Sequence, residues 1–227
     1  GVGYSVEQYN VEKLPPLPAS PAKPVMHHRV VDSIEGWMEA IHALIKGRWA
    51  GVHVEFDYSS IRPYGSPLVT SGGLAPGHLP LRNAIEKIRM LLATPSSRAL
   101  RPIEVHEMLC TIADAVLSGG IRRSAMMCIF DDTEIMYCKT GDWWKTKPWL
   151  SNANNSMRIC PFRADSPEMM SRILSLSRQY GEPGFIQLPV GKLLNPCGEI
   201  VLNPTGSRFS FCNLVEINCS TLPPTEG

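Results

Sequence analysis

The sequence has little net charge, no long apolar run and no closely spaced pair of cysteines. Its 22 Lys and Arg residues nearly balance 21 Asp and Glu residues, so the formal net charge is +1. A chain with so little excess charge has no electrostatic footprint for nucleic acid or for a membrane surface. No apolar run approaches the length of a membrane span, and no basic segment followed by an apolar one opens the chain. These absences predict a cytoplasmic protein that has neither a membrane nor nucleic acid as a partner.

The cysteines number seven, and no two of them form a CxxC pair. An odd count without close pairs argues against both a secreted disulfide framework and a compact zinc site. His106 and Cys110 have the i, i+4 spacing of two metal ligands on a helix, but no second pair accompanies them. We therefore expect these two side chains to pack in the interior, and we predict no metal site. The cysteine count fits redox use of one or two thiols better.

Helical and extended patterns alternate along the chain, which indicates an α/β layer. Apolar residues recur at helical spacing in three segments, and Ser166-Pro167 opens a further helix that ends near Tyr180; the three segments are 34–45, 81–92 and 105–116. Short runs typical of strands occur at 1–6, 52–58, 126–130, 134–138 and 184–190. Residues 8–30 contain five prolines, and residues 61–78 are rich in Gly, Pro and Ser, so both are expected to be loops.

The segment Asn195-Pro196-Cys197-Gly198-Glu199 brings an amide, a thiol and a carboxylate into one short loop. Pro196 biases Asn195 away from helix, and Gly198 frees the backbone one residue after the thiol. Glu199 can accept a proton from a hydroxyl, Asn195 can hold a neighbouring oxygen, and Cys197 can react between them. Taken alone, the same letters also fit an ordinary turn with a small buried cysteine.

One further segment has the chemistry of nucleotide recognition. Residues 118–125, SGGIRRSA, combine two glycines with exposed backbone N–H groups and two arginines whose forked donors suit phosphates or base edges. Taken alone, this octapeptide fits a helix end with solvated arginines better.

Several sequence motifs resemble those of the large chain of the ribonucleotide reductases. NPCGEI and FCNLVEIN, with GVGYSVE, IRPYGSPL, SGGIRRSA and GEPGF, occur in family order from residue 1 to about residue 219. The closest similarity is to the adenosylcobalamin-dependent (class II) branch, especially its ribonucleoside-triphosphate reductases. This resemblance implies part of the ten-stranded α/β barrel found in these reductases and in glycyl-radical enzymes, with Cys197 on a finger loop at its centre. On that basis residues 1–7 form a first barrel strand, 8–50 a linker and effector-region helix, and 51–227 a partial catalytic barrel.

The activity implied by the resemblance is the reduction of a ribonucleoside triphosphate to its 2′-deoxy form, which supplies DNA precursors. Adenosylcobalamin would generate a thiyl radical on Cys197, which takes the 3′ hydrogen of the substrate. Glu199 would accept the 3′-hydroxyl proton, and Asn195 would hold the hydroxyls. Cys212 would supply reducing equivalents by forming a disulfide with a second cysteine, recharged by thioredoxin or a similar dithiol.

The resemblance also implies regulation by a deoxynucleotide effector. The loop of Ser118, Gly119, Gly120, Ile121, Arg122 and Arg123 would carry information from the effector to the substrate base. Candidate contacts to the effector itself are Asp32, Ser33 and Arg62. The sequence alone leaves open a diphosphate substrate, another class of ribonucleotide reductase, and a non-catalytic nucleotide-binding module or split subunit.

This chain departs from the family pattern in what it does not contain. It begins with Gly1 instead of Met and reads as an interior piece of a longer protein. The partner of the redox cysteine, most of the cobalamin site and the second half of the barrel are expected to lie outside it. We therefore expect the 227 residues alone to be inactive and to need the remainder of their own chain or a split partner.

Overall fold

A computed structural model describes residues 1–20, 25–69, 72–117, 125–159, 166–205, 207–212 and 220 of the chain. Its centre is a parallel sheet of four strands in the order β1-β4-β5-β6. These strands are β1 (Val2–Ser5), β4 (Met126–Phe130), β5 (Ala153–Arg158) and β6 (Gly184–Ile186). The α/β class and the parallel arrangement agree with the expectation of part of an α/β barrel.

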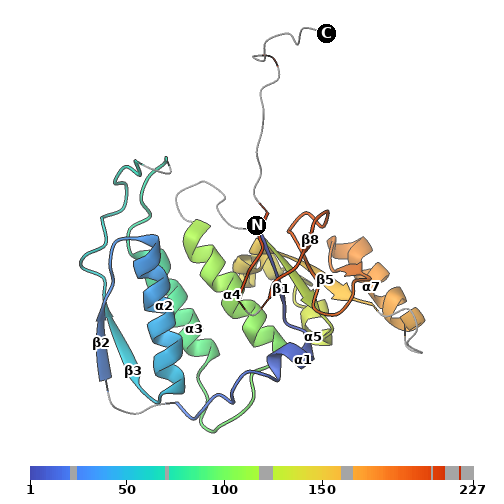
Figure 1. Ribbon diagram of the computed structural model, residues 1–227, viewed down its shortest axis with the longest axis horizontal. Coiled ribbons are helices and arrows are strands. Elements are labelled where there is room, and N and C mark those ends of the chain that lie inside the picture. Colours follow the sequence, from blue (N-terminus) through green and yellow to red (C-terminus); the bar gives the residue numbers. More distant parts are fainter. Residues whose placement is uncertain are drawn as a thin grey trace.

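Long helices and a second, smaller sheet complete the architecture (Figure 1). The helices are α2 (Ile34–Trp49), α3 (Leu79–Leu91), α4 (Pro102–Leu117) and α7 (Ser166–Tyr180). The small sheet pairs β2 (Val25–Arg29) in parallel with β3 (His53–Asp57). Figure 1 shows β2, β3, α2 and α3 on one side of α4, and the main sheet with α7 on the other. In the described ranges no helix is long and apolar enough to cross a membrane.

The remaining elements are short. They are the helices α1 (Gln8–Val11), α5 (Thr133–Met136) and α6 (Trp143–Thr146), the 3-10 helix η1 (Pro148–Asn152), and the strands β7 (Leu193–Leu194) and β8 (Val201–Leu202). The two strands β7 and β8 pair antiparallel and are joined by the loop that contains Cys197. Residues 193–202 are called the Cys197 hairpin from here on.

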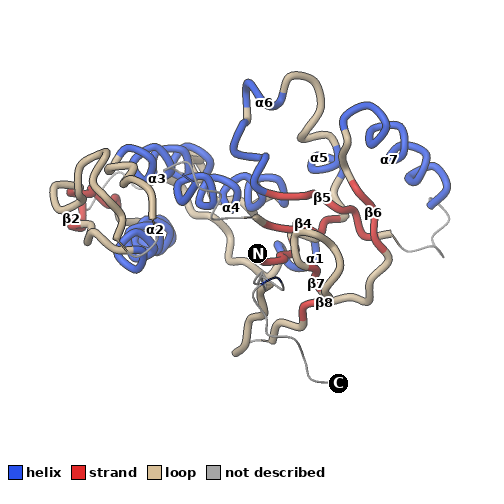
Figure 2. The backbone as a smooth tube through the Cα atoms, turned by 90° about the horizontal axis from the view of Figure 1, so that it is seen from above, coloured by secondary structure: helices blue, strands red, loops and turns tan. Residues whose placement is uncertain are grey.

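Strand β4 is buried along its whole length because both of its faces are covered. Its side chains alternate between the two faces, as those of any strand do. Met126, Cys128 and Phe130 belong to the large core that also contains the long helices. Met127 and Ile129 pack instead with Leu194 of β7. Figure 2 shows β7 and β8 on the opposite side of the main sheet from α7. The Cys197 hairpin therefore lies against the face of the sheet that the helices leave free.

The long helices and the strands at 1–6, 52–58 and 126–130 were predicted correctly. Helix α2 begins as its sequence suggests, because the Ser33 side chain accepts a hydrogen bond from the Gly36 N–H. Its apolar stripe is only partly covered, since Ile34 is 77% exposed and Met38 is 50% exposed.

Three predictions of local structure were wrong. Residues 134–138 were expected to be a strand, but Asp132 caps the backbone N–H groups of Glu134 and Ile135 and starts helix α5. The presumed loop at 8–30 contains α1 and β2. The strand expected at 184–190 is only the three-residue β6, which is not buried. Each of these runs is too short for periodicity to separate helix, strand and loop.

Candidate active site

Cys197 lies at the tip of its hairpin in a tight turn. The Gly198 N–H donates to the Asn195 carbonyl oxygen at 3.0 Å, which closes a four-residue turn from Asn195 to Gly198. Asn at the first position, Pro at the second and Gly at the fourth are the preferences of a type I turn, and Cys197 has no positive φ. Gly198 has a φ of +84°, a conformation that favours glycine. The turn leaves the Cys197 side chain exposed while Asn195 and Pro196 are buried.

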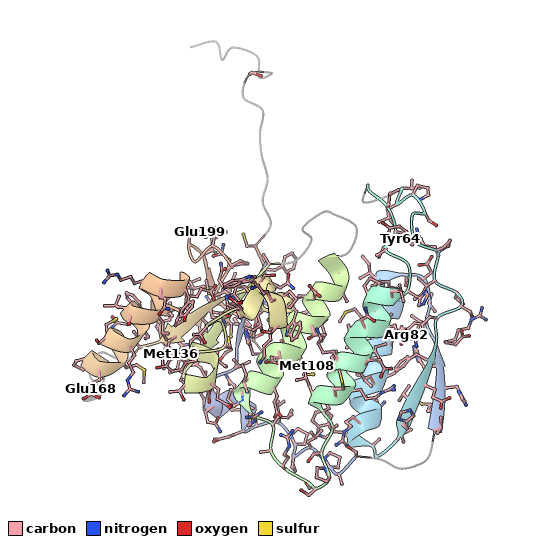
Figure 3. All side chains as sticks on the ribbon, turned by 180° about the vertical axis from the view of Figure 1, so that it is seen from behind. Tyr64, Arg82, Met108, Met136, Glu168 and Glu199 are labelled. Carbon is pink, nitrogen blue, oxygen red and sulfur yellow. The ribbon has the colours of Figure 1, made fainter. Side chains whose placement is uncertain are left out.

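Asn195 organises the tip through its side chain. Its Nδ2 donates to Glu199 Oε1 at 2.7 Å, and its Oδ1 accepts from the backbone N–H groups of Glu199 at 3.1 Å and Ile200 at 2.9 Å. Asn195 is fully buried, so these bonds satisfy polar atoms that water does not reach. The predicted grouping of amide, thiol and carboxylate in one small space is therefore present in the geometry. Figure 3 shows Glu199 at one end of the molecule, the end toward which the loop with Tyr64 also extends.

Strand β7 and the turn after it approach the backbone of β1 very closely. A Cβ atom built on Gly3 would lie 2.1 Å from the Leu194 carbonyl oxygen, and one built on Gly1 would lie 2.3 Å from Pro196 Cγ. A second strand of the main sheet also contacts the tip, because Asn154 Nδ2 of β5 donates to the Pro196 carbonyl oxygen at 2.6 Å. Cys197 is thus held near the amino ends of β1 and β5.

Cys212 is hydrogen-bonded to Gly1, which lies against Pro196 at the same tip. The Cys212 N–H donates to the Gly1 carbonyl oxygen at 2.8 Å, and the Gly1 amino group donates to the Cys212 carbonyl oxygen at 2.5 Å. Cys212 is a free, half-buried cysteine and not part of a strand in the described residues. The backbone of Gly1 therefore bridges the segments that contain the two predicted redox thiols.

Two other thiols are buried, Cys110 of α4 and Cys128 of β4, and a third, Cys138 just after α5, is half-buried. Tyr4 Oη lies 2.8 Å from His106 Nδ1 and 3.8 Å from Cys110 Sγ. Burial lowers the pKa of His106 to about 3, raises the pKa of Cys110 and of Cys138 to about 12, and raises that of Cys128 well above its ordinary value. The expected interior packing of His106 and Cys110 is what the structure contains. Among the described residues, no group of three or more His, Cys, Asp or Glu side chains is arranged to hold a metal ion.

Cys197 is exposed, whereas Cys110, Cys128 and Cys138 have raised pKa values, and this difference predicts which thiols react. In the folded protein at mildly alkaline pH, iodoacetamide is expected to modify Cys197 at least about 100-fold faster than Cys110, Cys128 or Cys138, because a raised pKa leaves little thiolate. Peptide mass spectrometry over time measures the rates. The same reaction in urea is the control and should modify all four cysteines at similar rates. Native modification of Cys110 as fast as Cys197 would contradict the assignment of Cys197 as the open thiol.

Of the residues predicted to take part in effector regulation, the structure describes Asp32, Ser33 and Arg62 but not the specificity loop. Arg62 Nε and Asp32 Oδ2 are 2.6 Å apart, so two of the predicted residues from separate segments are in direct contact. Ser33 is adjacent, but its side chain is used to cap α2. The predicted specificity loop, Ser118 to Arg123, lies outside the described residues.

Residues that the sequence did not single out support the tip and the base of the hairpin. Asn154 holds the Pro196 carbonyl oxygen at the tip. Glu7 and Arg158 form an almost fully buried ion pair below the base of the hairpin, with 2.5 Å between Arg158 Nε and Glu7 Oε1. These two residues are 151 positions apart, so no local pattern could have connected them.

Comparison with known proteins points to one enzyme family, although no family model matches the chain. The adenosylcobalamin-dependent ribonucleoside-triphosphate reductase of Lactobacillus delbrueckii subsp. bulgaricus is 28% identical over 219 residues, which cover 85% of this chain. The protein of the same name from Euglena gracilis is 30% identical over 175 residues, which cover 73% of this chain. A crystal structure of a B-12 dependent (class II) ribonucleotide reductase superposes with a TM-score of 0.71 over 85% of this chain at 23% identity. The chain is a relative of part of these reductases.

The resemblance noted in the sequence and the expected fold are thereby confirmed. The chain spans 28% of the length of the Lactobacillus reductase, 23% of the Euglena protein and 31% of the superposed crystal-structure chain. The chain therefore corresponds to one section of a ribonucleotide reductase, and this section includes the Cys197 hairpin.

Proposed function

We propose that this chain is a catalytic section of an adenosylcobalamin-dependent reductase that converts ribonucleoside triphosphates to 2′-deoxyribonucleotides. One observation carries the proposal: an exposed thiol at a hairpin tip, beside a buried amide that is hydrogen-bonded to a carboxylate. Radical removal of a 2′-hydroxyl needs these groups together, because one takes a hydrogen atom and another takes a proton. The names of the relatives support the same reading.

The three tip residues divide the chemistry. The Cys197 thiol gives up a hydrogen atom, and the resulting sulfur radical takes the hydrogen from the 3′ carbon of the substrate. Glu199 accepts the proton of the 3′-hydroxyl, while the 2′-hydroxyl leaves as water with a proton supplied by the reducing thiol pair that includes Cys212. Asn195 fixes the carboxylate by its bond to Glu199 Oε1, and because Asn195 is fully buried it acts on the substrate through Glu199. After reduction, the 3′ hydrogen returns from Cys197 to the sugar.

The cofactor fits this thiol by chemistry. When bound, adenosylcobalamin supplies a carbon radical that can accept a hydrogen atom from a thiol. Cys197 is exposed, so a group approaching from outside the hairpin can reach its sulfur. Cavities of about 380 Å³ between α3 and α4 and about 340 Å³ beside β1 are not lined by Cys197. Of the contacts that the cofactor would make, we assign to this chain only the one with the Cys197 sulfur.

Cys212 completes the redox part of the proposal. Reduction at the 2′ carbon consumes two electrons, and a pair of thiols supplies them by forming a disulfide. Cys212 is a free thiol whose backbone is bonded to Gly1, beside the hairpin tip. We assign no residue of this chain as its disulfide partner. A dithiol protein of the thioredoxin type would restore both thiols.

The contact between Asp32 and Arg62 supports an effector site for a deoxynucleotide. Replacing Arg62 with alanine removes the donor beside Asp32 and is expected to weaken the effect of added deoxynucleotides on substrate choice by about tenfold. Basal turnover without effector should change little, because Arg62 does not contact the hairpin. Turnover of several ribonucleotides with and without effector measures this. Arg29→Ala, which removes the nearby surface pair with Asp57, is the control; an equal effect of both variants would count against the site.

The activity itself is tested with the complete protein that contains this chain. Ribonucleoside triphosphate, adenosylcobalamin and a dithiol are expected to yield deoxynucleotide, and omission of the cofactor should stop its formation. Binding of nucleotide without any product, under conditions where the folded protein binds the cofactor, would favour a non-catalytic module instead.

A further inference from the structure

The base of the Cys197 hairpin is held by one arginine. Arg158 is the last residue of β5, and Glu7 follows β1, so the pair joins the carboxyl ends of two strands of the main sheet. Arg158 donates from Nε to Glu7 Oε1 at 2.5 Å and from Nη2 to Glu7 Oε2 at 3.0 Å. The side chains are only 10% and 3% exposed. Ser5 Oγ donates to the same carboxylate at 2.8 Å, which fixes its orientation further.

The other donors of Arg158 are directed to the chain that enters the hairpin. Nη1 donates to the carbonyl oxygens of Leu188 at 2.6 Å and Pro189 at 2.8 Å, and Nη2 donates to that of Lys192 at 3.2 Å. A guanidinium has five N–H donors, and these bonds use all of them. Lys192 directly precedes β7, so three backbone carbonyls just before the hairpin are tied to a point fixed in the sheet.

We infer that Arg158 is a positioning residue that, held by Glu7, sets where the Cys197 hairpin lies along β1 and thus where its thiol is presented. The hairpin strands β7 and β8 have two residues each, so their own ladder gives them little hold on the sheet. At the tip the hairpin is held by Asn154, and at the base by Arg158. These two contacts fix the ends of the hairpin, and the close packing of Leu194 against Gly3 lies between them.

If the ion pair served only to join β1 and β5, a change to lysine would loosen the sheet as a whole and not the hairpin in particular. Lysine keeps the positive charge beside Glu7, but its compact ammonium cannot reproduce a planar fork that reaches a carboxylate and three carbonyls at once. Arg98 provides a matched control, because it forms a bidentate pair with Glu104, at 2.7 and 2.8 Å, and donates to no residue of the hairpin. The two pairs differ in what else the arginine holds and in exposure, since the Arg98 side chain is 33% exposed and that of Arg158 is 10% exposed.

The experiment is hydrogen exchange followed by mass spectrometry on the complete protein that contains this chain, comparing Arg158→Lys with Arg98→Lys. In Arg158→Lys the amides of residues 193–202 are expected to exchange on the order of tenfold faster, while those of β4 keep their rates. Arg98→Lys should leave the hairpin unchanged. Glu7→Gln, which removes the charge with little change of shape, should give the same regional pattern and serves if Arg158→Lys fails to fold.

Two results would overturn the inference. One is unchanged exchange in the hairpin, and the other is an equal acceleration in β4, which would make the pair a general support of the sheet. Only the consequence for catalysis rests on the proposed function: turnover should fall in Arg158→Lys while the KM for nucleotide stays near its original value. Exchange is measured without nucleotide or cofactor, so a failure of the proposed activity and a failure of this inference give different results.

Discussion

Replacing Cys197 with serine is expected to abolish nucleotide reduction in the complete protein, with a loss of about 10⁴-fold or more, as for other residues that perform the chemical step. A serine hydroxyl is close to the thiol in size and more polar, but it does not give up a hydrogen atom to a carbon radical as a thiol does. The turn from Asn195 to Gly198 does not depend on the sulfur, since its bonds are made by the backbone and by Asn195. Deoxynucleotide formed per enzyme is the measurement.

Cys212→Ser is the matched control, because it also removes one thiol from the neighbourhood of the tip. The enzyme with this change should still carry out the first hydrogen transfer but should fail to complete repeated turnovers. Cys138→Ala, which removes a half-buried thiol with a raised pKa, should retain activity if the variant folds. Substantial reduction by Cys197→Ser would exclude Cys197 from the radical step.

Gly3→Ala is expected to destabilise the protein by about 3 kcal/mol and to displace the hairpin. Its new Cβ would lie 2.1 Å from the Leu194 carbonyl oxygen and 3.1 Å from the Leu194 carbonyl carbon, so the obstacle is backbone and cannot rotate away. Either β1 or the hairpin must move. Urea unfolding measures the loss of stability, and activity should fall further than stability alone explains.

Gly184→Ala is the control for that prediction. Its Cβ would meet Ser156 Oγ at 2.9 Å, the end of a side chain that can rotate, so a clearly smaller loss of stability is expected. Both glycines are in strands of the main sheet. Equal losses in the two variants would show that close contact with the hairpin is not what requires glycine at position 3.

The sequence was sufficient for the long helices and for the grouping at the hairpin tip. Helical periodicity over a dozen or more residues predicted α2, α3 and α4, and the letters around Cys197 predicted a tight turn. Proline and glycine have fixed meanings in such a turn, so Pro196 and Gly198 could be interpreted without tertiary information. Asn195 and Glu199 are four positions apart, and their hydrogen bond is local.

What the sequence could not supply depends on contacts between distant segments. The strands of the hairpin have two residues each, which is too short for any pattern. Their place on the sheet depends on Gly3, Asn154 and Arg158, which come from other strands. Asp132 turned an apolar run into helix α5, a capping effect that outweighs the β-propensity of so short a segment.

The most direct test of the central claim is the release of tritium from the 5′ carbon of adenosylcobalamin into water. A hydrogen atom that passes from the thiol to the cofactor and back washes the label out, because the thiol proton exchanges with solvent. The complete protein with Cys197 is expected to release tritium when nucleotide is present, and Cys212→Ser should do so as well. Cys197→Ala is predicted to release none. Tritium release by Cys197→Ala at the rate of the unaltered protein would contradict the account.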